Sequence, residues 1–252
     1  MAPTGSLCGT LRVGLAVANA KTDRAAKGSG IGLGIAKRFA HEGARVFITA
    51  RHQSQLDQAV ASIGGDAAGI QADSSDLGDL DRVFATIRDQ TGRIDVLAVS
   101  AGVYEFGTLG EITEEHFDKT FNTDVRGLLF TVQKALPLLS KGSSVILTGS
   151  MVSIKGFASC SVYNASKAAV RSFARTWIVD LKGRDIRVNV LSPGYTDTPG
   201  LSHFMTDEEK AAVVATVPLG RVHAKYRCQF FSNLEMSLSV GVGRRAGAEP
   251  PA

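Results

Sequence analysis

The 252-residue sequence has few of the features that mark disulfide frameworks, metal sites or membrane spans. Its three cysteines, Cys8, Cys160 and Cys228, are far apart and in no Cys-x-x-Cys or Cys/His spacing. We therefore expect no metal site, no disulfide framework and a reducing, cytoplasmic location. No apolar run approaches the roughly 18 residues of a membrane span, so no membrane partner is expected. With 7 prolines, 27 glycines and 44% hydrophobic residues, the composition excludes collagen, low-complexity disorder and coiled coil.

Excess charge is also scarce in the body of the chain. The formal net charge is +4, but residues 1–27 and 221–252 each carry +3, whereas residues 28–220 carry −2. No stripe of Lys and Arg interleaved with aromatic residues crosses that central body. The sequence therefore indicates no nucleic-acid partner.

From Gly28 to about Leu191, short apolar runs alternate with segments whose apolar residues recur with helical periodicity. Runs rich in Val, Ile and Leu are typical of strands buried on both faces of a parallel sheet. The sequence predicts an α/β fold, with a single Rossmann-type doubly wound parallel sheet flanked by helices on both faces. The expected strands are 45–49, 67–71, 94–100, 144–148 and 186–191, and the expected helices are 31–41, 53–63, 77–90, 116–139 and 161–181.

A glycine-rich segment, Gly28-Ser29-Gly30-Ile31-Gly32, opens the first expected helix. Glycines there let the backbone approach a pyrophosphate held at the helix N-terminus; a turn that binds nothing is the alternative. After the second expected strand, where NAD-binding folds usually place an acid, the chain has Arg51. A guanidinium can pair with a 2′-phosphate, so NADP(H) is favoured over NAD(H), the alternative being a solvated arginine.

Tyr163 and Lys167 lie four residues apart, on one face of the expected helix 161–181. A nearby ammonium favours the phenolate form of tyrosine, so this pair suits proton exchange with a carbonyl or carbinol oxygen. Ser150 follows the expected strand 144–148 and can donate a hydrogen bond to the same oxygen. These residues form the expected catalytic centre.

Together with Asp73, Ser100-Ala101-Gly102 and Pro193-Gly194, these motifs resemble the short-chain dehydrogenase/reductase family over residues 28 to about 221. The resemblance implies hydride transfer between a nicotinamide and a small ketone or secondary alcohol, with no metal. It implies that Tyr163 is the general acid in reduction and the base in oxidation. Lys167 would bind the nicotinamide ribose, and Ser150 would polarise the substrate oxygen.

The resemblance also implies cofactor contacts. Asp73 would bind the adenine amine and Thr198 the carboxamide side, although capping a turn and capping a helix are their structural alternatives. The expected cofactor-binding set is Ser29, Gly30, Ile31, Gly32, Arg51, Asp73, Ser74, Ser100, Ala101, Gly102, Tyr163, Lys167, Thr196 and Thr198.

The chain departs from the family pattern at three places before its tail, the mildest being Ser100-Ala101-Gly102, where the family has Asn-Ala-Gly. Where the family has Thr-Gly before the glycine motif, this chain has Ala25-Ala26, so the first strand is either displaced to 13–18 or poorly formed. The family's fourth catalytic residue, an asparagine, aligns with Asp124, which we keep in the catalytic set. Because a carboxylate only accepts hydrogen bonds, the alternative function is a cofactor-binding protein with impaired or no catalysis.

The two ends depart further. We divide the chain into an atypical segment 1–27 with the first strand, the dinucleotide-binding and catalytic domain 28–221, and an atypical tail 222–252. The abrupt loss of the pattern predicts a shifted reading frame or an altered gene boundary. Since family members commonly pair their last strand and its preceding helix across a tetramer interface, the expectation of a homo-oligomer, tetramer or dimer, is weakened by this tail.

The substrate pocket is expected to involve residues 152–157, Tyr195 and a short helical lid at 200–214. Phe204 and Met205 would face inward from that lid. The mixed apolar character of these pocket residues is compatible with a modest hydrophobic substrate but does not identify a particular compound.

Overall fold

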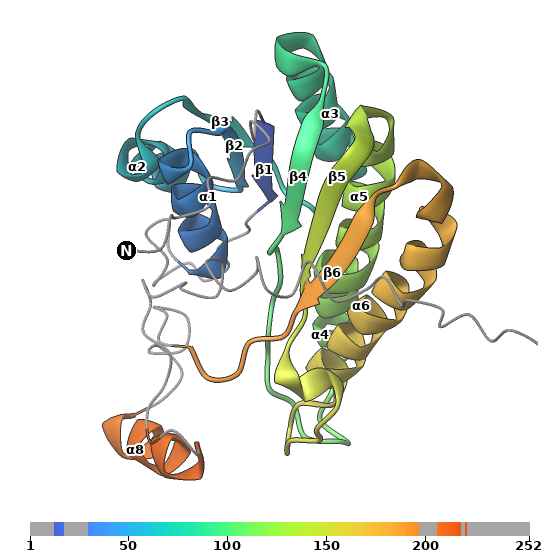
Figure 1. Ribbon diagram of the computed structural model, residues 1–252. Coiled ribbons are helices and arrows are strands. Elements are labelled where there is room, and N and C mark those ends of the chain that lie inside the picture. Colours follow the sequence, from blue (N-terminus) through green and yellow to red (C-terminus); the bar gives the residue numbers. More distant parts are fainter. Residues whose placement is uncertain (1–12, 18–29, 197–205, 218–219, 221–252) are drawn as a thin grey trace, which may run out of the picture.

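The structure is a computed structural model that describes residues 13–17, 30–196, 206–217 and 220. Six strands form one parallel sheet in the order β3-β2-β1-β4-β5-β6 (Figure 1). The strand order reverses between β1 and β4, as in a doubly wound Rossmann sheet, and the predicted fold class is confirmed. The strands are β1 (Val13–Val17), β2 (Arg45–Ala50), β3 (Ala67–Gln71), β4 (Ile94–Val99), β5 (Leu139–Thr148) and β6 (Arg187–Leu191).

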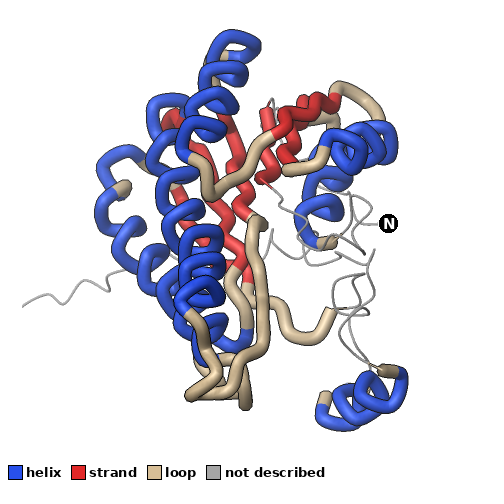
Figure 2. Tube along the Cα trace, turned by 180° about the vertical axis from the view of Figure 1, so that it is seen from behind, coloured by secondary structure: helices blue, strands red, loops and turns tan. Residues whose placement is uncertain are grey.

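Helices cover both faces of this sheet (Figures 1 and 2). Buried residues of α3, α5 and α6 pack on one face, and buried residues of α1 and α2 pack on the other. The α-helices are α1 (Ile31–His41), α2 (Gln53–Ile63), α3 (Leu77–Thr91), α4 (Glu114–Phe121), α5 (Leu128–Ala135), α6 (Ser161–Asp180) and α8 (Asp207–Thr216). The π turn η1 (Asn122–Gly127) joins α4 to α5, and the short 3₁₀ turns are η2 (Leu136–Leu138), η3 (Met151–Ser153) and η4 (Lys182–Arg184).

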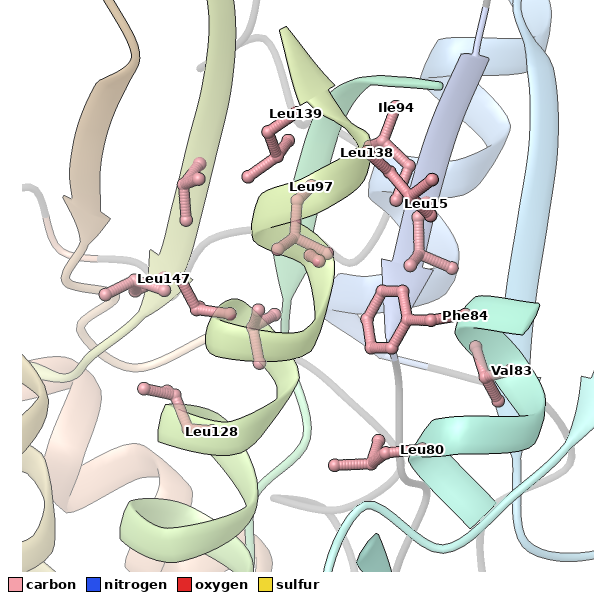
Figure 3. Packing of buried hydrophobic residues seen from close by; sticks show 14 of the residues in the cluster. Leu15, Leu80, Val83, Phe84, Ile94, Leu97, Leu128, Leu138, Leu139 and Leu147 are labelled. Carbon is pink, nitrogen blue, oxygen red and sulfur yellow. The ribbon is translucent and has the colours of Figure 1, made fainter. Parts of the chain in front are cut away.

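The core follows from the alternation of side chains along each strand. On β4, Leu97 packs against the α3, α5 and α6 side, whereas Ala98 packs against the α1 and α2 side. Figure 3 shows the first of these clusters, in which Leu15, Leu97 and Phe84 are buried. Each such large side chain contributes about 1.5–3 kcal/mol when fully buried. Burial on both faces explains why β1 and β4, apart from Asp95, are almost entirely apolar.

The first strand lies at the centre of the sheet, between β2 and β4. Leu15 is fully buried, and the Val13 N–H donates to Asp95 Oδ2 at 2.9 Å, which fixes the start of β1 against β4. The strand is therefore displaced upstream and well paired, the first of the two alternatives left open by the sequence. Residues 18–29, which connect it to α1, lie outside the described residues.

The expected helix 116–139 is wrong as a single regular helix. Thr113 Oγ1 accepts the His116 N–H at 3.1 Å, so α4 begins two residues earlier than expected. The π turn η1 interrupts the helix, and Pro137 in η2 ends it. The residues after η2 belong to β5, which starts at Leu139 rather than at Ser144.

Residues 207–214 of the expected helix at 200–214 are observed within α8, and residues 200–205 lie outside the described residues. Thr206 and Glu209 form a reciprocal capping box, which explains where α8 starts. No α8 residue is buried, and Figure 1 shows the helix apart from the sheet. Phe204 and Met205 lie outside the described residues. Across the described part of the chain, no helix combines the length and apolarity that crossing a membrane requires.

Candidate active site

Polar side chains gather beyond the carboxyl ends of β4 and β5. Gly102 lies in the loop after β4, and Asp124 lies in η1. Ser150 lies between β5 and η3, and Tyr163 and Lys167 lie on α6. Both η1 and η3 pack against α6. Segments far apart in the sequence are thus brought to one edge of the sheet, which is where doubly wound sheets bind ligands.

Asp124 and Lys167 form a buried ion pair at this edge. Lys167 Nζ lies 3.1 Å from Asp124 Oδ2, and the two side chains are 5% and 0% exposed. Asp124 Oδ1 accepts the Val103 N–H at 2.7 Å, and Ser166 Oγ lies 3.1 Å from Oδ2. The Val103 N–H and the Lys167 ammonium can only donate, which suits a carboxylate because it only accepts, whereas the Ser166 hydroxyl lies closer to the Tyr163 carbonyl oxygen, at 2.8 Å.

The electrostatic balance keeps Lys167 charged. Burial alone would lower the pKa of this lysine, but Asp124 and Tyr163 outweigh it, so the pKa lies above its ordinary value. The ammonium is 5.5 Å from the centroid of the Tyr163 ring. A fixed positive charge therefore sits next to the phenol at physiological pH.

The position of Asp124 depends on the π turn that carries it. Gly127, in the same turn, lies against the backbone of the β3–α3 loop, so closely that an added Cβ would be 2.5 Å from the Ser74 carbonyl oxygen. Arg126 Nη1 donates to the Ser75 carbonyl oxygen at 3.0 Å. These contacts fix η1 against the loop that carries Asp73, and π turns of this kind are frequent at functional sites.

Ser150 is buried and caps the turn η3. Its Oγ accepts the Val152 N–H at 3.3 Å, a bond that does not use its own hydroxyl proton. The neighbouring Met151 N–H donates to the Pro193 carbonyl oxygen at 3.1 Å, tying the end of β5 to the loop after β6. Ser150 is therefore held in place with a proton to donate.

An aromatic pair, Tyr104 and Phe106, lies on one side of Tyr163. The Tyr104 ring lies 5.9 Å from the Tyr163 ring, and Phe106 packs edge-on against Tyr104 at 6.2 Å. Burial, with a smaller contribution from Tyr163, raises the pKa of Tyr104 well above its ordinary value. Phe106 is 58% exposed and Ile154 is 68% exposed. Sequence reasoning missed Tyr104 and Phe106; their place in the loop after a buried strand was the available signal.

The N-terminus of α1 is suited to an anion. Gly30 precedes the helix with φ of +112°, a conformation that favours glycine. Among the described residues, no side chain caps this helix, its first turn contains no acid, and nothing lies within 4 Å of a Cβ built at Gly30. The N–H groups of the first turn, which contains Ile31 and Gly32, can therefore donate hydrogen bonds to a phosphate.

Arg51 and Asp73 follow β2 and β3 along the same edge of the sheet. The Arg51 side chain is half-buried, and its carbonyl oxygen accepts Gln71 Nε2 at 2.8 Å. Asp73 Oδ1 accepts the Ser75 N–H at 2.9 Å and lies 2.7 Å from Ser75 Oγ, so this side chain caps a turn. The second oxygen of Asp73 takes no part in that turn.

The remaining predicted residues divide between the site and the undescribed segments. Ser100 and Thr196 are half-buried, Ser74 and Ala101 are buried, and Ser29 and Thr198 lie outside the described residues. Within the described ranges, no group of three or more His, Cys, Asp or Glu side chains could hold a metal ion. The open α1 terminus and the charged Lys167 fit a dinucleotide that lies along the carboxyl edge of the sheet.

Known proteins are similar to this chain in sequence and in architecture. A family profile described as Enoyl-(Acyl carrier protein) reductase matches residues 25–228. "Oxidoreductase asL5" of Sarocladium schorii is 44% identical over 196 residues, which cover 77% of this chain and 79% of that protein. "Dehydrogenase/reductase SDR family member 4" of Homo sapiens is 34% identical over 202 residues, covering 78% and 70%. A solved dehydrogenase/reductase structure from Sinorhizobium meliloti 1021 superposes with a TM-score of 0.80 at 27% identity, covering 90% of this chain and 88% of that one.

Proposed function

The chain belongs to the short-chain dehydrogenase/reductase family, and we propose that it is an NADP(H)-dependent oxidoreductase acting on a ketone or secondary alcohol. The observation that carries the proposal is the arrangement of Ser150, Tyr163 and charged Lys167 at the carboxyl edge of the sheet. This arrangement supplies a proton donor, a hydrogen-bond donor and a fixed positive charge for one substrate oxygen.

The mechanism follows from these groups. A bound nicotinamide would supply the hydride in reduction and accept it in oxidation. In reduction, the Tyr163 hydroxyl donates its proton to the carbonyl oxygen as the carbinol C–H bond forms, and solvent then reprotonates the phenolate. Ser150 donates a hydrogen bond to the same oxygen, and Lys167 stabilises the phenolate and binds the ribose hydroxyls. Oxidation reverses each of these transfers.

The proposed preference for NADP(H) rests on charge at the end of β2. The open first turn of α1 suits the pyrophosphate, and Arg51 stands where an acid would otherwise bind the ribose 2′-hydroxyl. A guanidinium pairs with a 2′-phosphate through two hydrogen bonds, whereas an acid would repel it.

The substrate we propose is a small, hydrophobic carbonyl compound or the matching alcohol. Tyr104, Phe106 and Ile154 offer aromatic and aliphatic surface close to Tyr163 or exposed near it. We also propose a cytoplasmic location and a homo-oligomer. Exposed Phe117 on α4 and Val179 on α6 offer apolar surface for contacts between subunits.

Turnover with NADPH tests the proposal. Purified full-length protein is expected to oxidise NADPH in the presence of small ketones or quinone-like carbonyls. Tyr163→Phe should lower the rate by about 10²-fold or more while NADPH still binds, because the proton donor alone is lost. Binding of NADPH without turnover across a broad carbonyl panel would contradict the proposal and favour a cofactor-binding protein without catalysis.

A further inference from the structure

We propose that Asp124 is a positioning residue that balances the Lys167 charge beside Tyr163, so that Tyr163 remains a proton donor up to higher pH. This inference rests on the proposed function, and it assigns the site to the reductive direction. In that direction Tyr163 must be protonated when the carbonyl substrate binds. It gives a role to the residue at which this chain departs from its family.

Two obligate donors around Asp124, the Val103 N–H and the Lys167 ammonium, favour a carboxylate at this position. Oδ1 accepts the Val103 N–H, and Oδ2 is in contact with Lys167 Nζ and Ser166 Oγ. An asparagine in the same place would turn its NH₂ group towards one of these donors. The site is therefore built around a negative charge at this position, and an amide is a poor substitute for it.

Distance and burial determine how strongly that charge acts. The carboxylate oxygen is 3.1 Å from Lys167 Nζ, whereas the Tyr163 ring centroid is 5.5 Å from the same nitrogen. Since Asp124 has no exposed surface, solvent does little to screen the pair. Tyr163 therefore faces a compensated ion pair, which favours phenolate less than an isolated ammonium would.

The other titratable groups nearby leave this balance unchanged. Tyr104 faces Tyr163 from the loop after β4, and its raised pKa keeps it neutral. Burial raises the pKa of Cys160, at the start of α6, so the thiol also stays neutral. Glu105, in the loop after β4, forms an ion pair with Lys119 on α4. Among the described residues, Asp124 is the acid that contacts Lys167.

A pH titration of tyrosinate absorbance tests the inference on the full chain without substrate. The Tyr163 contribution is obtained by subtracting the titration of a matched Tyr163→Phe protein. Asp124→Asn is expected to move the Tyr163 midpoint to lower pH by about one unit, because the ammonium is then uncompensated. Asp118→Asn, the same change at an exposed site on α4, should leave the midpoint in place. An unchanged or higher midpoint in Asp124→Asn overturns the proposal.

A second variant guards against misfolding of the first. Asp124→Asn combined with Lys167→Met removes both charges, and replacing a buried ion pair in this way is often tolerated. If the pair is balanced, the Tyr163 midpoint stays within about half a unit of wild type. A rise of about one unit or more shows that Lys167 acts as an unbalanced cation and overturns the inference. Because the titration requires no turnover, this outcome is distinct from failure of the proposed oxidoreductase activity.

Discussion

Arg51 is the residue on which the proposed cofactor choice depends. It follows the last residue of β2, where the carboxyl edge of the sheet meets the open N-terminus of α1. The Gln71 side chain holds its carbonyl oxygen, so the backbone at Arg51 is tied to the end of β3. The guanidinium is thereby placed on the edge at which the adenosine half of a dinucleotide would lie.

Replacing Arg51 by Asp should reverse the electrostatic preference. We expect the ratio of kcat/KM for NADPH over NADH to fall by about ten- to a hundredfold, because a charge-assisted pair is exchanged for repulsion. The measurement is steady-state kinetics with both cofactors at one carbonyl concentration. Arg88→Asp, on an exposed site of α3, is the matched control and should leave the ratio unchanged. An unaltered ratio in Arg51→Asp would refute the role given to this residue.

Single residues also show where sequence reasoning ends. The four-residue spacing of Tyr163 and Lys167 was enough to place them on one helix face, because helical periodicity fixes that geometry. The ion pair between Asp124 and Lys167 could not be predicted in the same way. Its two residues belong to different elements, and only tertiary packing of η1 on α6 brings them together.

Among the secondary-structure elements, the π turn η1 connects catalytic geometry to the fold. It carries Asp124 as its third residue and ends at Gly127, which lies against the Ser74 backbone. Thr131 Oγ1 also donates to the Gly127 carbonyl oxygen at 2.7 Å. The turn therefore links the β3–α3 loop, with Asp73, to the Lys167 side of the site.

Gly127→Ala is expected to disturb both sides at once. Its Cβ would lie 2.5 Å from the Ser74 carbonyl oxygen, so backbone must move, and overpacking of this kind costs about 1–3 kcal/mol or more. Chemical denaturation should show that loss, and NADPH binding should weaken. Gly183→Ala, where nothing lies within 4 Å of the new Cβ, should cost less than about 0.5 kcal/mol. Equal stability of the two variants would contradict this account of η1.

The elements differ in how well sequence predicted them. The bounds of α1 and α2 match the expected ranges because their apolar residues recur with helical periodicity, and the bounds of β3 match as well. The early start of β5 was missed, since its first residues are mostly polar and are held by tertiary contacts. Ser143 Oγ, for example, donates to the Ile94 carbonyl oxygen at 2.9 Å. The π turn was missed because its backbone pattern leaves no distinct period in the side chains.

At the scale of the whole molecule, the sheet order determines where chemistry can occur. The reversal between β1 and β4 leaves a crevice at the carboxyl edge of the sheet. The loops after β2, β3, β4 and β5 all begin at this edge. The displaced β1 keeps this architecture because it pairs with both neighbours in register. The unusual segment before α1 therefore leaves the sheet intact, and the site retains its scaffold.

Transfer of label from cofactor to substrate tests directly whether the protein moves a hydride. The full-length protein is incubated with a small aryl ketone and NADPH carrying deuterium at one or the other hydride position. We expect an alcohol with one deuterium on the carbinol carbon from one of the two labelled forms, and no such product above background with Tyr163→Phe. Tight NADPH binding with no deuterated alcohol from either form, across the carbonyl panel, would contradict this expectation.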